Sequence, residues 1–200
     1  MKKLVLLTFV LVALALSAFA QGDAGKGITA KGFKVGVTMA NLTGDIEDTK
    51  MKIGFAAGGF FTYSFSPTFA IQPEVLYCMK GAKADTDEGE KLKLDYLAIP
   101  VMFKYSFPTE GKIAPNIFAG PEVGILLSAK EEDEDIKEYF KSVDFGIGFG
   151  AGIDIAMESG KLTLDARYTL GLSNIADTDE DESDFSVKNA TIMVMLGYGF

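Results

Sequence analysis

The last eight residues of the chain, Met193-Val194-Met195-Leu196-Gly197-Tyr198-Gly199-Phe200, carry the pattern that decides the fold. Large apolar side chains occupy every second position, and methionine or glycine fills the positions between them. Successive side chains of a β-strand point to opposite faces, so this stretch predicts a strand with one bulky apolar face. We expect it to close a barrel by pairing with the first strand, because a chain that ends within a strand leaves no tail to obstruct closure.

Seven earlier segments show the same period of two, which makes eight predicted strands in all. The strands are predicted at Gly32–Leu42, Met51–Phe65, Phe69–Gly81, Leu92–Phe107, Ala114–Ala129, Phe140–Met157, Lys161–Leu172 and Val187–Phe200. The Phe140–Met157 segment is the clearest, since bulky apolar residues alternate there with glycine and aspartate. Charged residues and glycines therefore share one face of the predicted sheet, and the large apolar residues share the other.

Two features indicate which face lies inside. Glycine suits a narrow, crowded interior, and the glycine-rich face is also the charged face. The segments span 11 to 18 residues, longer than strands of soluble sheets and suited to tilted membrane strands. The sequence therefore predicts an all-β fold, an eight-stranded antiparallel up-and-down transmembrane β-barrel. The alternative fold is a soluble lipocalin-like ligand-binding barrel, which would bury the apolar face instead.

The connections between the predicted strands alternate in length and charge. Those at 43–50, 82–91, 130–139 and 173–186 are long and hold 19 of the 28 acidic residues, whereas those at 66–68, 108–113 and 158–160 are tight. Long loops outside and short turns inside are the rule for outer-membrane barrels. Aromatic residues near the predicted strand ends would form the girdles at the two membrane interfaces, and we expect Phe140 to be one of them.

The first residues predict export. Lys2 and Lys3 precede an apolar run from Leu4 to Leu16, and Ala18-Phe19-Ala20 forms a small-x-small site. This is the pattern of a signal peptide over 1–20, cleaved between Ala20 and Gln21, with the barrel domain over 21–200. The run is short for a bilayer span, which disfavours a retained anchor. Export and barrel together predict a location in the bacterial outer membrane.

Composition excludes several kinds of function. The net charge of −9 and the pI near 4.6 argue against nucleic-acid binding, which needs a basic footprint. The chain has no histidine, so it has no Ser-His or Cys-His dyad. Cys78 is the only cysteine, and it can form no internal disulfide. We expect no enzyme and no cofactor; a lipid-acting hydrolase at the barrel rim would lack its usual base.

The predicted inner face carries nine charged residues that would share one lumen. They are Lys34, Glu74, Lys80, Lys104, Glu122, Asp144, Asp154, Asp165 and Arg167. Charges in so narrow a space must pair, because an isolated buried charge is costly. Arg167 is the only arginine, and its planar fork can bridge carboxylates. We expect a polar network that holds the barrel rigid. A proton or ion path, and hence a narrow channel for ions or small solutes, stays open as an alternative.

The acidic loops suggest a second, weaker kind of site. Asp177-Thr178-Asp179-Glu180-Asp181 resembles the start of an EF-hand loop, but Glu182 stands where that loop needs glycine. The candidate ligands of a divalent cation are Asp177, Asp179, Asp181 and Asp184, and no specific metal site is predicted. Solvated loops that resist aggregation are the alternative. A loosely held cation could also bridge the loops to lipopolysaccharide or to a partner.

Five stretches carry a resemblance to a known family. They are Leu94-Asp95-Tyr96-Leu97-Ala98-Ile99-Pro100-Val101, Phe118-Ala119-Gly120-Pro121-Glu122-Val123-Gly124, the glycine repeat from Asp144 to Gly152, Asp165 to Ile175, and Leu196-Gly197-Tyr198-Gly199-Phe200. The chain resembles the eight-stranded outer-membrane β-barrel family called porin-like or PorT-like. The resemblance implies architecture and location, not a substrate. We expect a structural or interaction role in the cell envelope, with outer-membrane lipid, lipopolysaccharide and the barrel-assembly machinery as partners, the last through the strand ending at Phe200.

Overall fold

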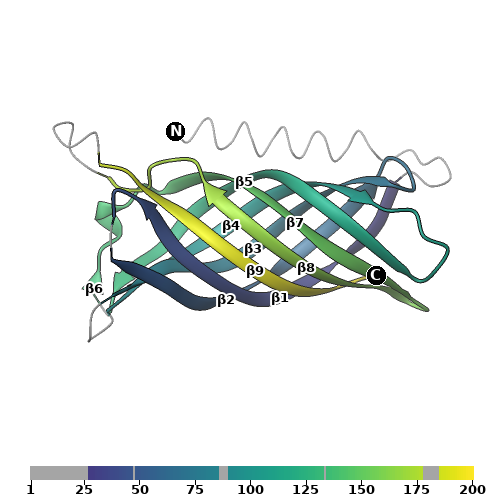
Figure 1. Cartoon of the computed structure of the whole chain (residues 1–200), viewed down its shortest axis with the longest axis horizontal. Helices are drawn as coiled ribbons and strands as arrows, with labels where there is room; N and C mark the ends of the chain where they lie inside the picture. The colour runs from purple at the N-terminus through teal and green to yellow at the C-terminus, as the bar shows by residue number, and fades with distance from the viewer. Residues whose placement is uncertain (1–26, 47, 86–89, 133, 178–184) are drawn as a thin grey trace.

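The computed structural model describes residues 27–46, 48–85, 90–132, 134–177 and 185–200, and the predicted signal peptide lies outside them. These residues form one closed wall of antiparallel strands (Figure 1). The strands are β1 (Gly27–Gly44), β2 (Thr49–Ser64), β3 (Phe69–Ala84), β4 (Lys91–Ser106), β5 (Ile113–Glu131), β6 (Glu134–Asp135), β7 (Val143–Met157), β8 (Gly160–Gly171) and β9 (Val187–Gly199), with a 3₁₀ turn η1 (Lys137–Tyr139). No helix in the described part is long and apolar enough to cross a membrane.

The strand order confirms the predicted up-and-down barrel. The sheet runs β4-β3-β2-β1-β9-β8-β7-β5-β6, and an additional pairing of β4 with β5 closes it. The two-residue β6 only extends β5, so eight long strands make the wall. β9 pairs with β1 as expected, and in their register Phe33 stands opposite Tyr198 and Val37 opposite Val194.

The two faces of the wall lie as the alternation predicts. On β1 the side chains of Phe33 and Val35 are 70% and 57% exposed, whereas Lys34 is 2% exposed. The same contrast recurs around the barrel, because its exposed large residues are mainly Phe, Ile, Leu and Val while lysines, aspartates and glutamates are buried inside. Exposing an apolar surface of this extent to water would be unfavourable, whereas contact with the hydrocarbon of a bilayer would not be. This arrangement is opposite to the one expected of a soluble lipocalin-like barrel.

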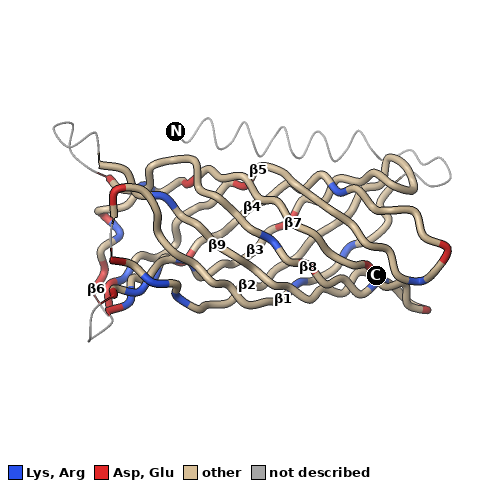
Figure 2. Tube along the Cα trace, in the orientation of Figure 1, with Lys and Arg blue, Asp and Glu red and all other residues tan. Residues whose placement is uncertain are grey.

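The two ends of the barrel differ. Short turns join β2 to β3, β4 to β5 and β7 to β8 at the end where the chain also finishes, which we call the turn end (Figure 1). The described residues that connect β1 to β2, β3 to β4, β5 to β7 and β8 to β9 lie at the other, the loop end, where acidic residues gather together with lysines (Figure 2). In outer-membrane barrels the end with the long loops faces outside, and we expect the same of this loop end. The first loop is shorter than the expected 43–50, because β1 ends at Gly44 and β2 already begins at Thr49.

Two local expectations at the loop end are wrong. The sixth long strand begins at Val143 instead of Phe140. Phe140 follows η1, forms an isolated bridge with Ala176 and packs against an interior apolar cluster, so it is not part of an outer girdle. Simple alternation from Gly120, Glu122 and Gly124 predicts that Ser128 also lies on the inner face. A register shift opposite Asp95 and Tyr96 reverses the alternation of β5 there.

This bulge changes what fills the lumen. Leu126 and Ala129 are both buried, whereas Leu127, which follows Leu126, is 45% exposed. The additional residue therefore places Ala129 inside in place of Ser128, next to Leu126, at the loop end of the barrel. They join a cluster contributed by five strands and the loop after β8. Its buried members are Leu42, Ala82, Leu94, Tyr96, Leu126, Ala129, Ile175, Ala176 and Val187.

Candidate functional site

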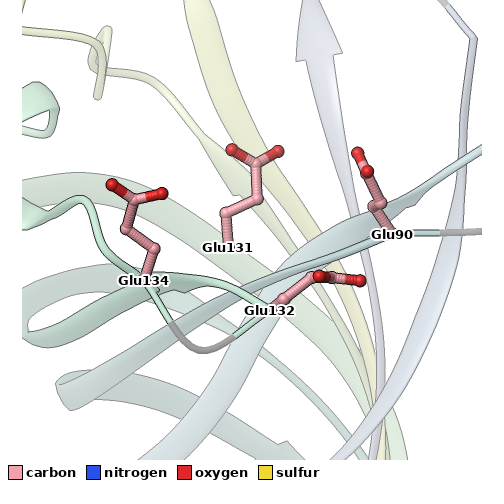
Figure 3. A pocket seen from close by; sticks show the side chains of 4 residues that line it. All are labelled: Glu90, Glu131, Glu132 and Glu134. Carbon is pink, nitrogen blue, oxygen red and sulfur yellow. The ribbon is translucent and has the colours of Figure 1, made fainter.

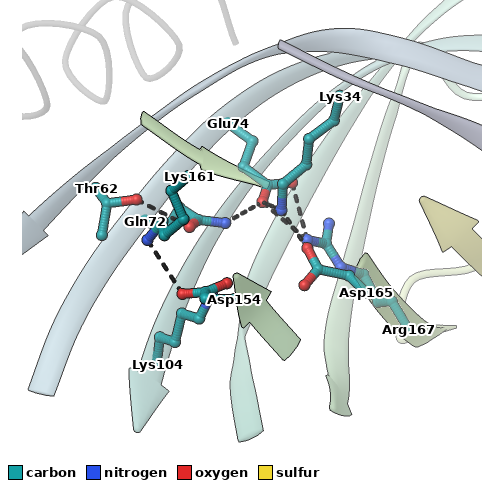
Figure 4. A network of polar contacts seen from close by, with 9 residues as sticks. All are labelled: Lys34, Thr62, Gln72, Glu74, Lys104, Asp154, Lys161, Asp165 and Arg167. Carbon is teal, nitrogen blue, oxygen red and sulfur yellow. Dashed lines mark hydrogen bonds and ion pairs between the residues drawn. The ribbon is translucent and has the colours of Figure 1, made fainter. Parts of the chain in front are cut away.

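The middle of the lumen is occupied by four charged side chains from three strands (Figure 4). Arg167 Nη2 on β8 donates to both carboxylate oxygens of Glu74 on β3, at 2.9 and 2.8 Å. Lys34 Nζ on β1 lies 2.9 Å from Glu74 Oε1 and also donates to Asp165. All four are at least 98% buried. Two cations face two carboxylates, so the group is neutral as a whole, which offsets the cost of removing each charge from water.

This central cluster spans the full width of the barrel. In the closed strand order, three strands separate β3 from β8 on either side, so Glu74 and Arg167 come from opposite walls. Gln72 donates to Glu74 at 2.7 Å, and Thr62 donates to Gln72 at 2.9 Å, which extends the cluster to β2. Arg167 also lies over the ring of Phe118, 5.4 Å from its centre. The lumen at this level is filled with paired side chains.

A second group lies toward the turn end. Asp154 on β7 accepts from Lys104 on β4 at 2.9 Å and from Lys161 on β8 at 3.1 Å (Figure 4). The Lys161 side chain is 24% exposed, whereas those of Lys104 and Asp154 are 2% and 9% exposed. The group therefore meets solvent at the turn end through one lysine.

A third group lies between the central cluster and the loop end. Lys80 Nζ lies 2.8 Å from Glu122 Oε1 and 5.1 Å from the centre of the Tyr96 ring. Asp144 has no ion pair among the described residues. It accepts instead from Asn189 at 2.9 Å and from Ser173 at 2.8 Å.

The structure thus places all nine predicted inner charges inside the barrel and divides them among these three groups. The nine predicted residues omit several polar participants, including Lys161, Thr62 and Ser173. Lys52 on β2 is 6% exposed and donates to the backbone oxygen of Lys80 at 2.8 Å. Gln72 and Asn189 are uncharged, but both stand on the inner face by alternation, and that position is the signal that could have found them.

Glycines on β7 make room for these side chains. A Cβ atom added to Gly150 would lie 2.8 Å from the Phe118 ring and 2.2 Å from the backbone oxygen of Ala166. One added to Gly148 would lie 2.8 Å from the terminal methyl group of Met102. The glycine repeat therefore accommodates large side chains from the adjacent strand β5 and from β4 beyond it.

The loop end of the lumen is covered by a short segment that we call the strap, residues 174–177. Ile175 of the strap is fully buried in the apolar cluster. Its backbone N–H donates to Val187 at 2.8 Å, and its oxygen accepts from Lys141 at 2.8 Å. The Asn174 side chain accepts from the N–H groups of Ala176 and Val187 at 3.1 and 2.9 Å. The strap is thereby fixed to both β9 and the segment before β7.

An acidic pocket lies outside this cover. Glu90, Glu131, Glu132 and Glu134 line an open cavity of about 410 Å³ at the loop end (Figure 3). Within the described ranges, no group of three or more acidic or cysteine side chains is arranged to hold a metal ion. Of the predicted cation ligands only Asp177 is described, and it is exposed; Asp179, Asp181 and Asp184 lie outside the described residues.

Comparison with known proteins agrees with this architecture. Residues 19–177 match the family described as outer membrane protein beta-barrel domain. Neisserial surface protein A shares the fold at a TM-score of 0.56 and 14% identity, covering 85% of this chain and 97% of its own. The outer membrane protein OprG from Pseudomonas aeruginosa does so at 0.53 and 13%, covering 90% and 99%. No curated protein sequence matches the chain.

Proposed function

The chain belongs to the outer membrane protein beta-barrel domain family, and we propose that it acts as a sealed, non-enzymatic barrel that presents an acidic surface at the outside of the bacterial outer membrane. One observation carries the proposal: the lumen is filled across its whole width and then covered by apolar residues. Such a barrel can hold loops and surfaces in place, but it offers solutes no way through.

The apolar cluster is the strongest barrier. An ion that left the polar groups at Asp144 would next meet Leu94, Leu126 and Ile175, which are at most 2% exposed. Passage would strip its water without supplying oxygen or nitrogen ligands, at a cost of several kcal/mol or more. The central cluster is a second barrier, because the pair of Glu74 and Arg167 would have to separate.

A narrow ion path is the competing function. It is favoured by the titratable groups that follow one another from Asp154 at the turn end through Glu74 to Asp144. Each of these carboxylates is held by fixed donors, and the series ends at the apolar cluster. The geometry therefore supports a rigid interior better than a conducting one.

A non-enzymatic role is supported by the chemistry of the available groups. The chain has no histidine, and Cys78 is fully buried in a second apolar cluster with Leu76, Met193 and Met195. The buried carboxylates of the lumen are held in ion pairs or hydrogen bonds with other inward-facing side chains. We therefore assign the interior to stability and the loop end to contact with other molecules.

Two parts of the proposal concern biogenesis. We propose that the signal peptide is removed between Ala20 and Gln21, which an intact mass of the mature protein would test. We also propose that the barrel-assembly machinery engages the strand that ends at Phe200.

Planar-bilayer recording tests the sealed barrel directly. Purified, refolded protein should give no stable open-channel currents, and its folded state is checked by heat-modifiable gel mobility. A matched variant, Leu94→Ser with Ile175→Ser, places hydroxyl groups in the cluster and should raise the frequency of small currents. Large, long-lived currents from the unaltered protein would refute the proposal.

A further inference from the structure

Three prolines interrupt the pairing of neighbouring strands on one side of the barrel. Pro73 lies within β3, Pro100 within β4 and Pro121 within β5. Proline has no backbone N–H group, so it cannot donate a hydrogen bond to the next strand and is rare inside central strands. Each proline here coincides with a gap in one ladder. The β2–β3 ladder omits Gln72 and Pro73, the β3–β4 ladder omits Ile99 and Pro100, and the β4–β5 ladder omits Gly120 and Pro121.

Strand β4 loses pairing on both of its edges. Its residues Ile99 and Pro100 are unpaired toward β3, and Val101 and Met102 are unpaired toward β5. We call these four residues, 99–102, the hinge segment. The register sets Pro73 of β3 and Pro121 of β5 on either side of Val101. The hinge segment is therefore held by fewer backbone hydrogen bonds than a regular central strand provides.

The strands that follow β5 around the barrel pair without such gaps. The β5–β7 ladder includes every residue of β5 from Ile113 to Ile125, and the β7–β8 ladder includes every residue of β7 from Gly146 to Met157. The seam of β1 with β9 is equally complete from Gly32 onward. The proline gaps are therefore a local property of one side of the wall, centred on β4.

The outer side of the hinge segment belongs to the apolar surface of the barrel. Val75 of β3 and Phe103 of β4, which lie at the two gaps on this side, are each 51% exposed. Val101 lies opposite Pro121, which cannot donate to its carbonyl group. Within the hydrocarbon of a bilayer no water molecule replaces a missing donor, so an unpaired backbone group is costly there. The pairing of this wall is thus weakest where lipid offers no substitute.

An ion pair inside the lumen crosses β4. Lys80 Nζ on β3 lies 2.8 Å from Glu122 Oε1 on β5, although β4 stands between these two strands. Glu122 is opposite Pro100 in register, and the Lys80 ammonium also lies 5.1 Å from the centre of the Tyr96 ring on β4. Both charged side chains are 2% exposed. The pair therefore ties β3 to β5 directly, over the inner surface of the strand whose own ladders are interrupted.

We propose that the hinge segment is a place where the barrel wall opens toward the membrane, and that the ion pair of Lys80 and Glu122 holds it closed. Removing one partner of a buried ion pair is strongly destabilising, because the remaining charge has no compensation. Local opening then occurs where backbone pairing is weakest, which is the hinge segment. The inference goes beyond the sealed barrel, since it concerns the wall and leaves the apolar cluster at the loop end in place.

The only cysteine of the chain reports on this opening. Cys78 is fully buried in one cluster with Leu76 and Ala98, which pair at the edge of the β3–β4 gap. The protein, refolded into lipid vesicles, is treated with N-ethylmaleimide, which is uncharged and enters the bilayer, or with a negatively charged thiosulfonate, which does not. Opening toward the membrane should let N-ethylmaleimide label Cys78 faster than the charged reagent does.

The ion pair is tested by two matched variants. Glu122→Gln leaves Lys80 without its carboxylate and should speed labelling by N-ethylmaleimide about tenfold or more. Asp154→Asn leaves Lys104 without its carboxylate in the group near the turn end, and it should change the rate by less than about twofold, because that group is distant from the hinge segment. Heat-modifiable mobility shows whether each variant is folded.

The prolines are tested by a second pair of variants. Pro121→Ala restores an N–H donor opposite Val101 and should slow labelling by roughly fivefold, which corresponds to one backbone hydrogen bond. Pro115→Ala is the control, because Pro115 is also exposed on the outer side of β5 but lies where the β5–β7 ladder is complete. Its labelling rate should equal that of the unaltered protein.

Three results would overturn the proposal. Equal acceleration by Glu122→Gln and Asp154→Asn would indicate general unfolding. Equal labelling of Cys78 by the two reagents would indicate access through the lumen. Equal rates in Pro121→Ala and the unaltered protein would show that the interrupted ladder does not control the opening.

Discussion

Lys31 and Phe200 exchange both backbone hydrogen bonds of an antiparallel pair: the Phe200 N–H donates to Lys31 at 2.8 Å, and the Lys31 N–H donates to Phe200 at 3.1 Å. The Lys31 ammonium lies 5.6 Å from the centre of the Phe200 ring, and the Phe33 ring lies 6.4 Å from it. The last residue is therefore the final rung of the seam between β9 and β1, and its ring rests on the outer wall at the turn end.

Deleting Phe200 should slow barrel closure, because it removes two seam hydrogen bonds and an aromatic contact at once. We expect a lower yield of the heat-modifiable folded form after refolding into vesicles. Phe107→Ala is the control, since Phe107 is a similarly exposed aromatic at the turn end but lies away from the seam. Equal folding of the truncated chain and the unaltered chain would contradict this account.

Breaking the central cluster should destabilise the barrel strongly. Glu74→Gln leaves Lys34 and Arg167 facing Asp165 alone, and Arg167→Met leaves Lys34 facing two carboxylates. Each single change leaves a buried charge uncompensated and should lower the free energy of unfolding by about 3–5 kcal/mol. The double variant restores neutrality, so it should be more stable than either single one. Denaturant unfolding in detergent measures this, and simple additivity would show that the pair is not coupled.

Removing the Asn174 side chain should loosen the strap. Asn174→Ala deletes its donation to Phe185 at 2.8 Å and the two bonds that it accepts from Ala176 and Val187. Unpaired N–H groups cost about 1–3 kcal/mol when buried. We expect faster amide hydrogen exchange in the strap, with Asn41→Ala as control on the outer wall. Unchanged exchange would mean that packing of Ile175 alone holds the strap.

Two glycine substitutions on β7 should differ in cost. Gly150→Ala meets the Phe118 ring and the Ala166 backbone oxygen, neither of which can move easily. Gly148→Ala meets first the flexible end of Met102. Overpacking costs about 1–3 kcal/mol where neighbours cannot adjust. The Gly150 variant should therefore unfold at clearly lower denaturant concentration than the Gly148 variant, and the reverse order would count against the packing described.

Which side chains of the wall face outward was predictable from the sequence, because the direction of each side chain in a strand alternates from one residue to the next. Phe33 and Lys34 show this, since each could be placed from its neighbours alone. Ser128 could not, because a bulge adds one residue and reverses every later direction on β5. Phe140 could not either, since its place depends on the strap that covers the lumen.

The partners inside the lumen were beyond prediction for a different reason. Glu74 and Arg167 are 93 positions apart in sequence, and they meet only because β3 and β8 stand opposite in the closed ring. Nothing in the sequence near either residue indicates that Arg167 pairs with Glu74 instead of with Glu122 or Asp154. Asp144 illustrates a second limit, because its donors are neutral and carry no charge pattern to find.

The cover of apolar residues at the loop end makes the interior one-sided with respect to solution. Lys161 gives the charged interior a partly exposed side chain at the turn end, whereas Ile175 and Leu94 shield the interior at the loop end. In the sealed barrel proposed above, protons and small ions would therefore reach Asp154 and Glu74 from the turn end, past Lys161. The charges inside such a barrel would equilibrate with the compartment at the turn end, and the medium at the loop end would contact the acidic pocket instead.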